Sequence, residues 1–233
     1  MSNVAIIQAR LGSTRLPGKV LMNIKGKSII DWILDRVLSS NLIDKVVVAI
    51  PSNRENDALY DHLNKRQIDI FRGDEDDVLS RILNAGVYFK AENIIRICAD
   101  NPLVDPEQLD FLIKFFRDNQ CDYCYNHIPI KNKYPDGLGG EISSLKVLKK
   151  IDQLAILKHH REHCFSYIWD YLNDFKVLTF NPPDNRIFFP QIRLDVDNIE
   201  DYEKICSLDI NPKMSSLEII DAYKKSKYFK LGD

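Results

Sequence analysis

Residues 4–19 read Val-Ala-Ile-Ile-Gln-Ala-Arg-Leu-Gly-Ser-Thr-Arg-Leu-Pro-Gly-Lys. The first four residues are apolar and partly β-branched, a pattern that predicts a buried strand. This strand leads directly into a loop with Gly12 and three cations, Arg10, Arg15 and Lys19. Glycine lets backbone N–H groups approach an anion closely, and guanidinium groups can bind phosphate oxygens through two hydrogen bonds. The loop therefore indicates a polyphosphate site.

The spacing of this loop differs from the two common glycine-rich nucleotide motifs. A P-loop requires Gly-x-x-x-x-Gly-Lys-Ser/Thr, and a dinucleotide-binding turn requires Gly-x-Gly-x-x-Gly. The alternative without a function is an ordinary basic loop after a strand. We favour a nucleotide site of a different chemistry, because the strand, the glycines and the ordered Arg and Lys residues occur together.

Length and composition limit the possible functions. A chain of 233 residues suits one large α/β domain, and its 45% hydrophobic and 28% charged residues are ordinary for a globular protein. A net charge of -2 gives no general attraction to nucleic acid or to anionic membranes, so phosphate recognition has to be local. The sequence contains no run of about 18 apolar residues and no signal-peptide pattern, so we expect a cytoplasmic protein without membrane insertion.

Strand and helix patterns alternate through the first hundred residues. After the first strand we expect a helix at 29–38, a strand at 44–50, a helix at 54–65, a strand at 68–71, a helix at 76–89 and a strand at 93–98. This alternation predicts a doubly wound, mostly parallel sheet with right-handed crossovers. In such a sheet the ligand site lies beyond the carboxyl ends of the strands, where the phosphate loop and Asp100 both fall.

The second half of the chain is less regular. We expect helices at 106–118, 145–151, 161–172, 199–207 and 215–225, and strands at 121–126, 141–143, 175–180 and 192–196. The mixed strand directions around 121–181 predict a small antiparallel insertion that forms a substrate lid or a dimer surface. No shift in composition separates a second domain, so residues 1–233 are expected to form a single domain.

Three aspartates are candidate metal ligands. Asp100 ends a predicted buried strand, and Asp195 and Asp197 would project to the same face of another. Attack on a nucleoside triphosphate needs a divalent metal, and Mg²⁺ prefers few carboxylates together with water and phosphate oxygens. The alternative is structural: Asp100 would begin a turn and Asp197 would cap the next helix.

The run from Gln8 to Lys19 resembles the opening motif of cytidylyltransferases, the enzymes that make CMP-linked ketodeoxyoctonate or sialic acid. The resemblance is closer still to the spore-coat polysaccharide biosynthesis protein F group. Later segments also resemble that group: 72–81, 99–106, 134–138, 161–163 and 196–201. The chain departs from the family pattern after Pro-Asp-Gly, where Leu138-Gly139-Gly140-Glu141 replaces the frequent Leu-Asp-x-Glu.

The resemblance implies both a fold and a reaction. The fold would be a Rossmann-like nucleotide-diphospho-sugar transferase (GT-A-like) fold. The reaction would be Mg²⁺-dependent transfer of CMP from CTP to a small anionic acceptor, a sugar acid or a phosphorylated compound, with release of pyrophosphate. The resemblance places this reaction in surface polysaccharide or glycoconjugate biosynthesis, and we expect a homodimer.

The resemblance also implies roles for individual residues. The expected nucleotide-binding residues are Gln8, Ala9, Arg10, Gly12, Ser13, Arg15, Lys19, Arg72, Gly73 and Asp77. The expected catalytic residues are Arg15, Lys19, Asp100 and Asp197, with the two aspartates binding Mg²⁺ and Asp195 as an optional third ligand. The expected substrate-binding residues are Asp136, Glu141, Arg161, His163 and Arg193.

Two other functions stay open at this level. A glycosyltransferase of the related nucleotide-sugar fold would use Asp195-Val196-Asp197 as its metal motif, although the phosphate loop suits a triphosphate better. A noncatalytic subunit would bind CTP without turnover. The choice of cytosine rests on the resemblance alone, and no residue pattern specifies the acceptor.

Two further patterns are interpreted as structural. Cys121 and Cys124 have CxxC spacing, but no second CxxC accompanies them, so we expect buried free thiols. The segment 159–163, His-His-Arg-Glu-His, lacks the His-Glu-x-x-His arrangement of a zinc site. It is predicted to begin a helix that places Arg161 and His163 near an acidic substrate or a subunit contact.

Overall fold

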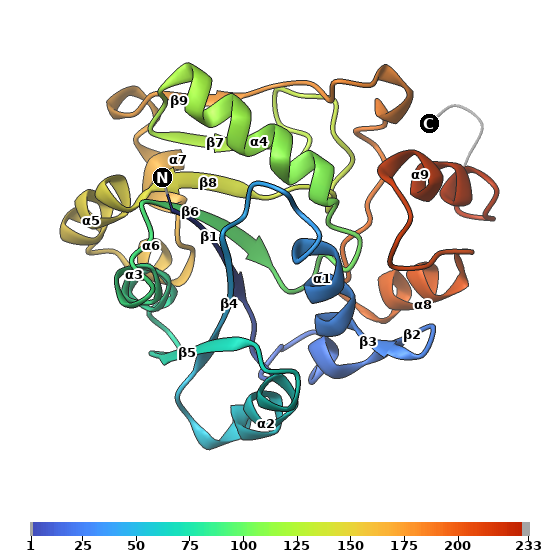
Figure 1. Ribbon diagram of the computed structural model, residues 1–233, viewed down its shortest axis with the longest axis horizontal. Coiled ribbons are helices and arrows are strands. Elements are labelled where there is room, and N and C mark those ends of the chain that lie inside the picture. Colours follow the sequence, from blue (N-terminus) through green and yellow to red (C-terminus); the bar gives the residue numbers. More distant parts are fainter. Residues whose placement is uncertain (1, 230–233) are drawn as a thin grey trace.

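The computed structural model describes residues 2–229, and a seven-stranded sheet lies at its centre (Figure 1). In spatial order the strands are β5 (Asp69–Gly73), β4 (Lys45–Pro51), β1 (Asn3–Gln8), β6 (Asn93–Cys98), β8 (Glu141–Ser144), β7 (Tyr123–Tyr125) and β9 (Val177–Thr179). Strand β8 is antiparallel to both of its neighbours, and the other pairs are parallel. The predicted mostly parallel sheet with an antiparallel insertion is therefore confirmed.

Helices cover both faces of this sheet (Figure 1). They are α1 (Ile29–Val37), α2 (Asp57–Lys65), α3 (Val78–Tyr88), α4 (Pro106–Asn119), α5 (Leu145–Leu154), α6 (Lys158–Glu162), α7 (Ser166–Asp170), α8 (Ile199–Ser207) and α9 (Ser216–Lys224). Short 3₁₀ helices are η1 (Lys19–Leu21), η2 (Arg54–Asn56), η3 (Leu172–Asp174) and η4 (Asn185–Ile187), and β2 (Asn23–Ile24) pairs with β3 (Lys27–Ser28).

The apolar run of β1 lies at the centre of the core. Val4 and Ile6 pack in a cluster with α3 and α5, whereas Ala5 and Ile7 pack on the other face with α1, α4 and α9. All four side chains are fully buried, because β1 lies between β4 and β6 and is covered on both faces. Within residues 2–229, no helix combines the length and the apolar character needed to cross a membrane.

The predicted helix at 161–172 is wrong. The chain instead forms α6 and α7, and His163 has an extended conformation between them. The break turns Cys164 and Phe165 into the core, where the Phe165 ring lies 4.8 Å from that of Tyr123 on β7. The free energy gained by burying these two side chains outweighs that of a continuous helix.

The predicted strand at 192–196 is also wrong. Within this segment, Arg193 pairs with Asp136 in an isolated parallel β-bridge. The next backbone partner lies elsewhere, because the N–H of Val196 donates to the carbonyl of Asp100 at 2.8 Å. Since the hydrogen bonds go to two separate segments, no continuous ladder forms.

The Gly139-Gly140 pair is required by its close packing against Asn126. The side-chain oxygen of Asn126 accepts the N–H of Gly140 at 3.0 Å, and its amide nitrogen donates to the carbonyl of Gln108 at 3.0 Å. Asn126 is fully buried in this position. A Cβ atom at residue 139 would overlap the side-chain and carbonyl oxygens of Asn126, so the chain requires glycine there.

We expect Gly139→Ala to lower the free energy of unfolding by about 1–3 kcal/mol, because the added methyl group forces Asn126 and its partners to move. Urea denaturation followed by circular dichroism measures this change. Gly12→Ala is the matched control, since a Cβ there would have its nearest neighbour at 3.4 Å. Equal stability of Gly139→Ala and the wild type would contradict the packing argument.

Candidate active site

The loop after β1 is held by hydrogen bonds from its own backbone and from η2. The N–H of Leu11 donates to the side-chain oxygen of Asn56 at 2.8 Å, and the N–H of Gly18 donates to the carbonyl of Leu11 at 2.9 Å. Gly18 has φ 71°, in the left-handed region that favours glycine. Asn56 is fully buried and therefore a positioning residue. Sequence reasoning missed it, because it lies in an unremarkable polar segment.

A cleft of about 330 Å³ opens at the carboxyl ends of β1 and β6. Its lining residues come from four separate parts of the chain: Gln8, Ala9, Arg10, Ser13, Thr14, Arg15, Lys19, Val20, Arg96, Cys98, Ala99, Asp100, His163 and Asp197. Nine of them belong to the site predicted from the sequence. The structure therefore brings the phosphate loop, both principal aspartates and His163 to one place.

Lys19 is the centre of this cleft. Its ammonium nitrogen lies 3.6 Å from Oδ2 of Asp100 and 3.7 Å from Oδ1 of Asp197, and it donates to the carbonyl of Val196 at 2.8 Å. Only 12% of the Lys19 side chain is exposed. Arg15 also pairs with Asp197, at 2.9 Å. The predicted convergence of Lys19, Asp100 and Asp197 is thus present, and their catalytic roles stay a prediction.

Two further carboxylates, Asp136 and Asp195, lie near Arg193 and outside the cleft lining. Arg193 binds Asp195, with its Nε at 3.1 Å from Oδ1, and lies 3.9 Å from Asp136 and 3.7 Å from Asp197. Burial raises the pKa of Asp136 to about 6; the charge of Asp195 adds to this rise, and Arg193 opposes it. Asp195 is buried against Arg193 and does not line the cleft.

Two carboxylates of the cleft, Asp100 and Asp197, can serve as ligands of a divalent cation. Burial raises the pKa of Asp100; Lys19 opposes this shift, and the charges of Asp197 and Asp195 add to it. A cation bound beside Asp100 would favour its ionised form. Asp100 and Asp197 offer hard carboxylate oxygens around the Lys19 ammonium, and hard oxygen donors suit Mg²⁺ and Mn²⁺.

A comparison with known families accounts for this arrangement. Residues 4–229 match the family model described as "Cytidylyltransferase". The chain belongs to the cytidylyltransferase family. It is 37% identical over 224 residues to the spore coat polysaccharide biosynthesis protein SpsF of Bacillus subtilis, a match that covers 92% of this chain and 91% of that protein.

Solved structures agree with the family. A cytidylyltransferase from Leptospira borgpetersenii has a TM-score of 0.87 and 31% identity, covering 97% of this chain and 94% of that one. The CMP:2-keto-3-deoxy-manno-octonic acid synthetase complexed with CTP has a TM-score of 0.67 and 20% identity, covering 89% and 98%, and shows the shared fold. The predictions of a cytidylyltransferase resemblance and of a nucleotidyltransferase enzyme are confirmed.

In this cytidylyltransferase, Glu141 lies beneath the cleft and not in it. Its carboxylate pairs with the guanidinium of Arg96 and accepts the hydroxyl of Tyr123, and Glu141 is 3% exposed. Despite this burial, Arg96 helps to hold the pKa of Glu141 below its ordinary value. The expectation that Glu141 contacts substrate does not fit this placement, because both of its oxygens are engaged by the protein.

Arg96 is a charged cleft residue that the sequence analysis missed. Its Nε donates to the side-chain oxygen of Gln8 at 2.8 Å, and the Glu141 carboxylate holds the other side of the guanidinium. An isolated arginine within the apolar run of β6 was the available signal. A buried cation in a strand needs such partners, so Arg96 is fixed in the wall of the cleft.

The predicted residues Asp77 and Arg161 are bound to each other outside the cleft. The Asp77 side chain accepts the N–H of Ser80 at the start of α3 and pairs with Arg161 at 2.6 Å. Arg161 also pairs with Asp152 at 2.8 Å. Their expected roles in binding nucleotide and substrate are not supported by this placement, since these contacts join α3, α5 and α6.

Arg72 and Gly73 also lie outside the cleft lining. Arg72 donates to the carbonyl of Asn53 at 2.8 Å and pairs with Asp57 at 2.8 Å, and the carbonyl of Gly73 accepts the N–H of Ser52. The structure does not bring them to the phosphate loop directly. Arg72 is connected to the phosphate loop only through other residues. It donates to Asn53, whose side-chain oxygen accepts the amide of Asn56 at 2.5 Å, and Asn56 in turn holds the N–H of Leu11.

We expect Asp136→Asn to gain stability relative to the wild type as the pH rises from about 4 to about 7. The folded protein holds the Asp136 proton more tightly than the unfolded chain, because the pKa in the folded state is raised to about 6. The stability that this proton contributes is present at low pH and is lost as the pH rises through the folded pKa. Asparagine cannot ionise, so the Asp136→Asn variant does not undergo this loss of stability as the pH rises.

Chemical denaturation of both proteins at several pH values measures this difference. Asp118→Asn, at the exposed end of α4, is the control for loss of a surface carboxylate. A difference between Asp136→Asn and the wild type that stays constant with pH would show that burial does not shift Asp136.

Proposed function

We propose that this chain transfers CMP from CTP to a sugar acid or a phosphorylated acceptor in the cytoplasm, with Mg²⁺ as cofactor and pyrophosphate as the second product. The reaction would serve surface polysaccharide or glycoconjugate synthesis. The observation that carries the proposal is the position of Lys19 between Asp100 and Asp197 beside a basic glycine-containing loop. The name of the similar SpsF protein and the CTP complex of the similar synthetase support it.

The cations of the loop would bind the triphosphate. Arg10, Arg15 and Lys19 line one cleft, and Lys19 is held there by Asp100, Asp197 and the carbonyl of Val196. Fixed donors favour charge that develops on the leaving pyrophosphate, and one such donor lowers the barrier by about 3 kcal/mol. This is a transition-state role and not only a binding role.

Asp100 and Asp197 would hold the Mg²⁺ ion. When bound, the ion supplies a Lewis acid that offsets negative charge on the phosphate being attacked. Arg96 and His163 line the same cleft and suit the carboxylate or phosphate of an acidic acceptor. Asp136 and Arg193 would support the acceptor side of the cleft, because Arg193 lies 3.9 Å from Asp136 and 3.7 Å from Asp197.

We expect pyrophosphate release with CTP and Mg²⁺ in the presence of a suitable acceptor, and less with ATP, GTP or UTP. A screen of sugar acids, sugar phosphates and alditol phosphates tests this. Lys19→Met and Asp100→Asn should each lower kcat by roughly 10²-fold or more, because each removes charge that the transition state needs. Lys27→Met, which removes an exposed lysine paired with Asp35, should leave kcat unchanged.

The outcomes separate the competing functions. Preference for another triphosphate would overturn the assignment of cytosine. Nucleotide binding without pyrophosphate release from any mixture would indicate a noncatalytic subunit. Sugar transfer from a nucleotide sugar would indicate a glycosyltransferase.

We also propose a homodimer formed through the segments around α6 and α7. Five large apolar side chains are exposed there: Leu154, Ile156, Leu157, Tyr171 and Leu172. Ile156 is 86% exposed, and an exposed group of apolar side chains is typical of a protein interface. The patch falls within the predicted insertion at 121–181.

We expect Ile156→Glu to convert a dimer into a monomer, because a carboxylate in an apolar interface has no partner. Light scattering coupled to size-exclusion chromatography measures the mass. Tyr88→Glu, at a 70% exposed position on α3, is the control. A monomeric wild type, or a variant that stays dimeric, would rule out this interface.

A further inference from the structure

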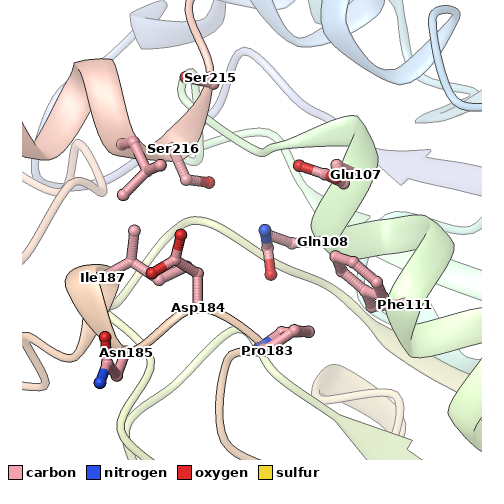
Figure 2. A pocket seen from close by; sticks show the side chains of 10 residues that line it. Glu107, Gln108, Phe111, Pro183, Asp184, Asn185, Ile187, Ser215 and Ser216 are labelled. Carbon is pink, nitrogen blue, oxygen red and sulfur yellow. The ribbon is translucent and has the colours of Figure 1, made fainter.

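A second pocket lies between the first turns of α4 and α9 and the segment 183–187 (Figure 2). Its volume is about 520 Å³, within the range of small-molecule sites. None of its lining residues lines the nucleotide cleft. The pocket therefore needs an explanation of its own.

Two buried polar side chains are turned into this pocket. The hydroxyl of Ser216 is without a hydrogen-bond partner, and Ser216 is 4% exposed. Gln108 is also 4% exposed, and its side-chain oxygen accepts the hydroxyl of Tyr134 at 3.0 Å. Figure 2 shows the Ser216 oxygen and the Gln108 nitrogen pointing into the space between the segments. Buried polar groups normally have partners, so the unpartnered hydroxyl of Ser216 favours a polar ligand.

The charged side chains that line the pocket are both acidic and favour an uncharged ligand over an anionic one. Glu107 and Asp184 both line it, and the carboxylate of Asp184 is turned inward although it also pairs with Arg186 at 2.6 Å. Glu107 would repel phosphates and sugar acids, whereas the charge of Asp184 is offset by Arg186. Hydroxyl groups can donate to carboxylates and accept from an amide.

The remaining wall is apolar. Phe111 and Pro183 lie along one side, and Ile187 lies across from them (Figure 2). The C–H face of a sugar ring packs on such surfaces while its hydroxyl groups reach polar groups at the edge. From the buried donors, the inward carboxylates and this wall, we propose that the pocket binds an uncharged sugar residue. The proposal does not depend on the reaction in the nucleotide cleft.

Saturation-transfer NMR with the full chain tests the proposal, using D-glucose, D-galactose and N-acetyl-D-glucosamine as probes and D-glucuronate as the charged comparison. We expect at least one uncharged sugar to bind, and D-glucuronate to bind at least tenfold more weakly. Phe111→Ala and Ser216→Val should each weaken binding at least tenfold. Ser207→Ala and Tyr88→Ala are the matched controls and should bind like the wild type.

Competition and activity identify the site. Saturating CTP should not displace the sugar, and Phe111→Ala should keep the pyrophosphate release of the wild type, so failure of the sugar site is distinguishable from failure of the nucleotide site. The proposal is overturned if no uncharged sugar binds, if D-glucuronate binds as well, if CTP displaces the sugar, or if both pocket variants bind normally.

Discussion

The ammonium group of Lys19 lies 3.6 Å and 3.7 Å from two carboxylates that come from distant parts of the chain, Asp100 and Asp197. A carboxylate pair in a cleft is unfavourable without a cation. The same lysine donates to the carbonyl of Val196, whose N–H donates to the carbonyl of Asp100. The Lys19 side chain and the backbone of Val196 thus join the glycine loop, the end of β6 and the segment before α8.

The supports of this arrangement are buried polar residues with no direct access to the cleft. Asn56 holds the phosphate loop through the N–H of Leu11, and Glu141 holds Arg96 in the wall. Buried pairs of this kind fix geometry, because each partner would be costly to leave alone. Asp77 and Arg161, which are only partly buried, join the start of α3 to α6. Family motifs in this chain therefore contain both residues that line the cleft and residues that hold it.

Local patterns made the fold and the loop predictable. The run from Val4 to Ile7 is buried on both faces. Residue patterns identified the main-sheet strands and the α-helices of the first hundred residues, because periodicity follows from local geometry, whereas the short β2 and β3 were not predicted. Asn56 and Arg96 were missed because their importance depends on partners far away in sequence. The segment 192–196 was misread for the same reason: it looks like a strand, but its backbone bonds go to two different segments.

The central claim is that Asp100 and Asp197 act together on one cation beside the nucleotide. Calorimetric titration of CTP with Mg²⁺ into the wild type, Asp100→Asn, Asp197→Asn and the double variant tests this directly. Two ligands of one ion are coupled, so the loss of binding free energy in the double variant should differ from the sum of the single losses by more than about 0.5 kcal/mol. Losses that add would mean that the two carboxylates act at separate places and would contradict the account.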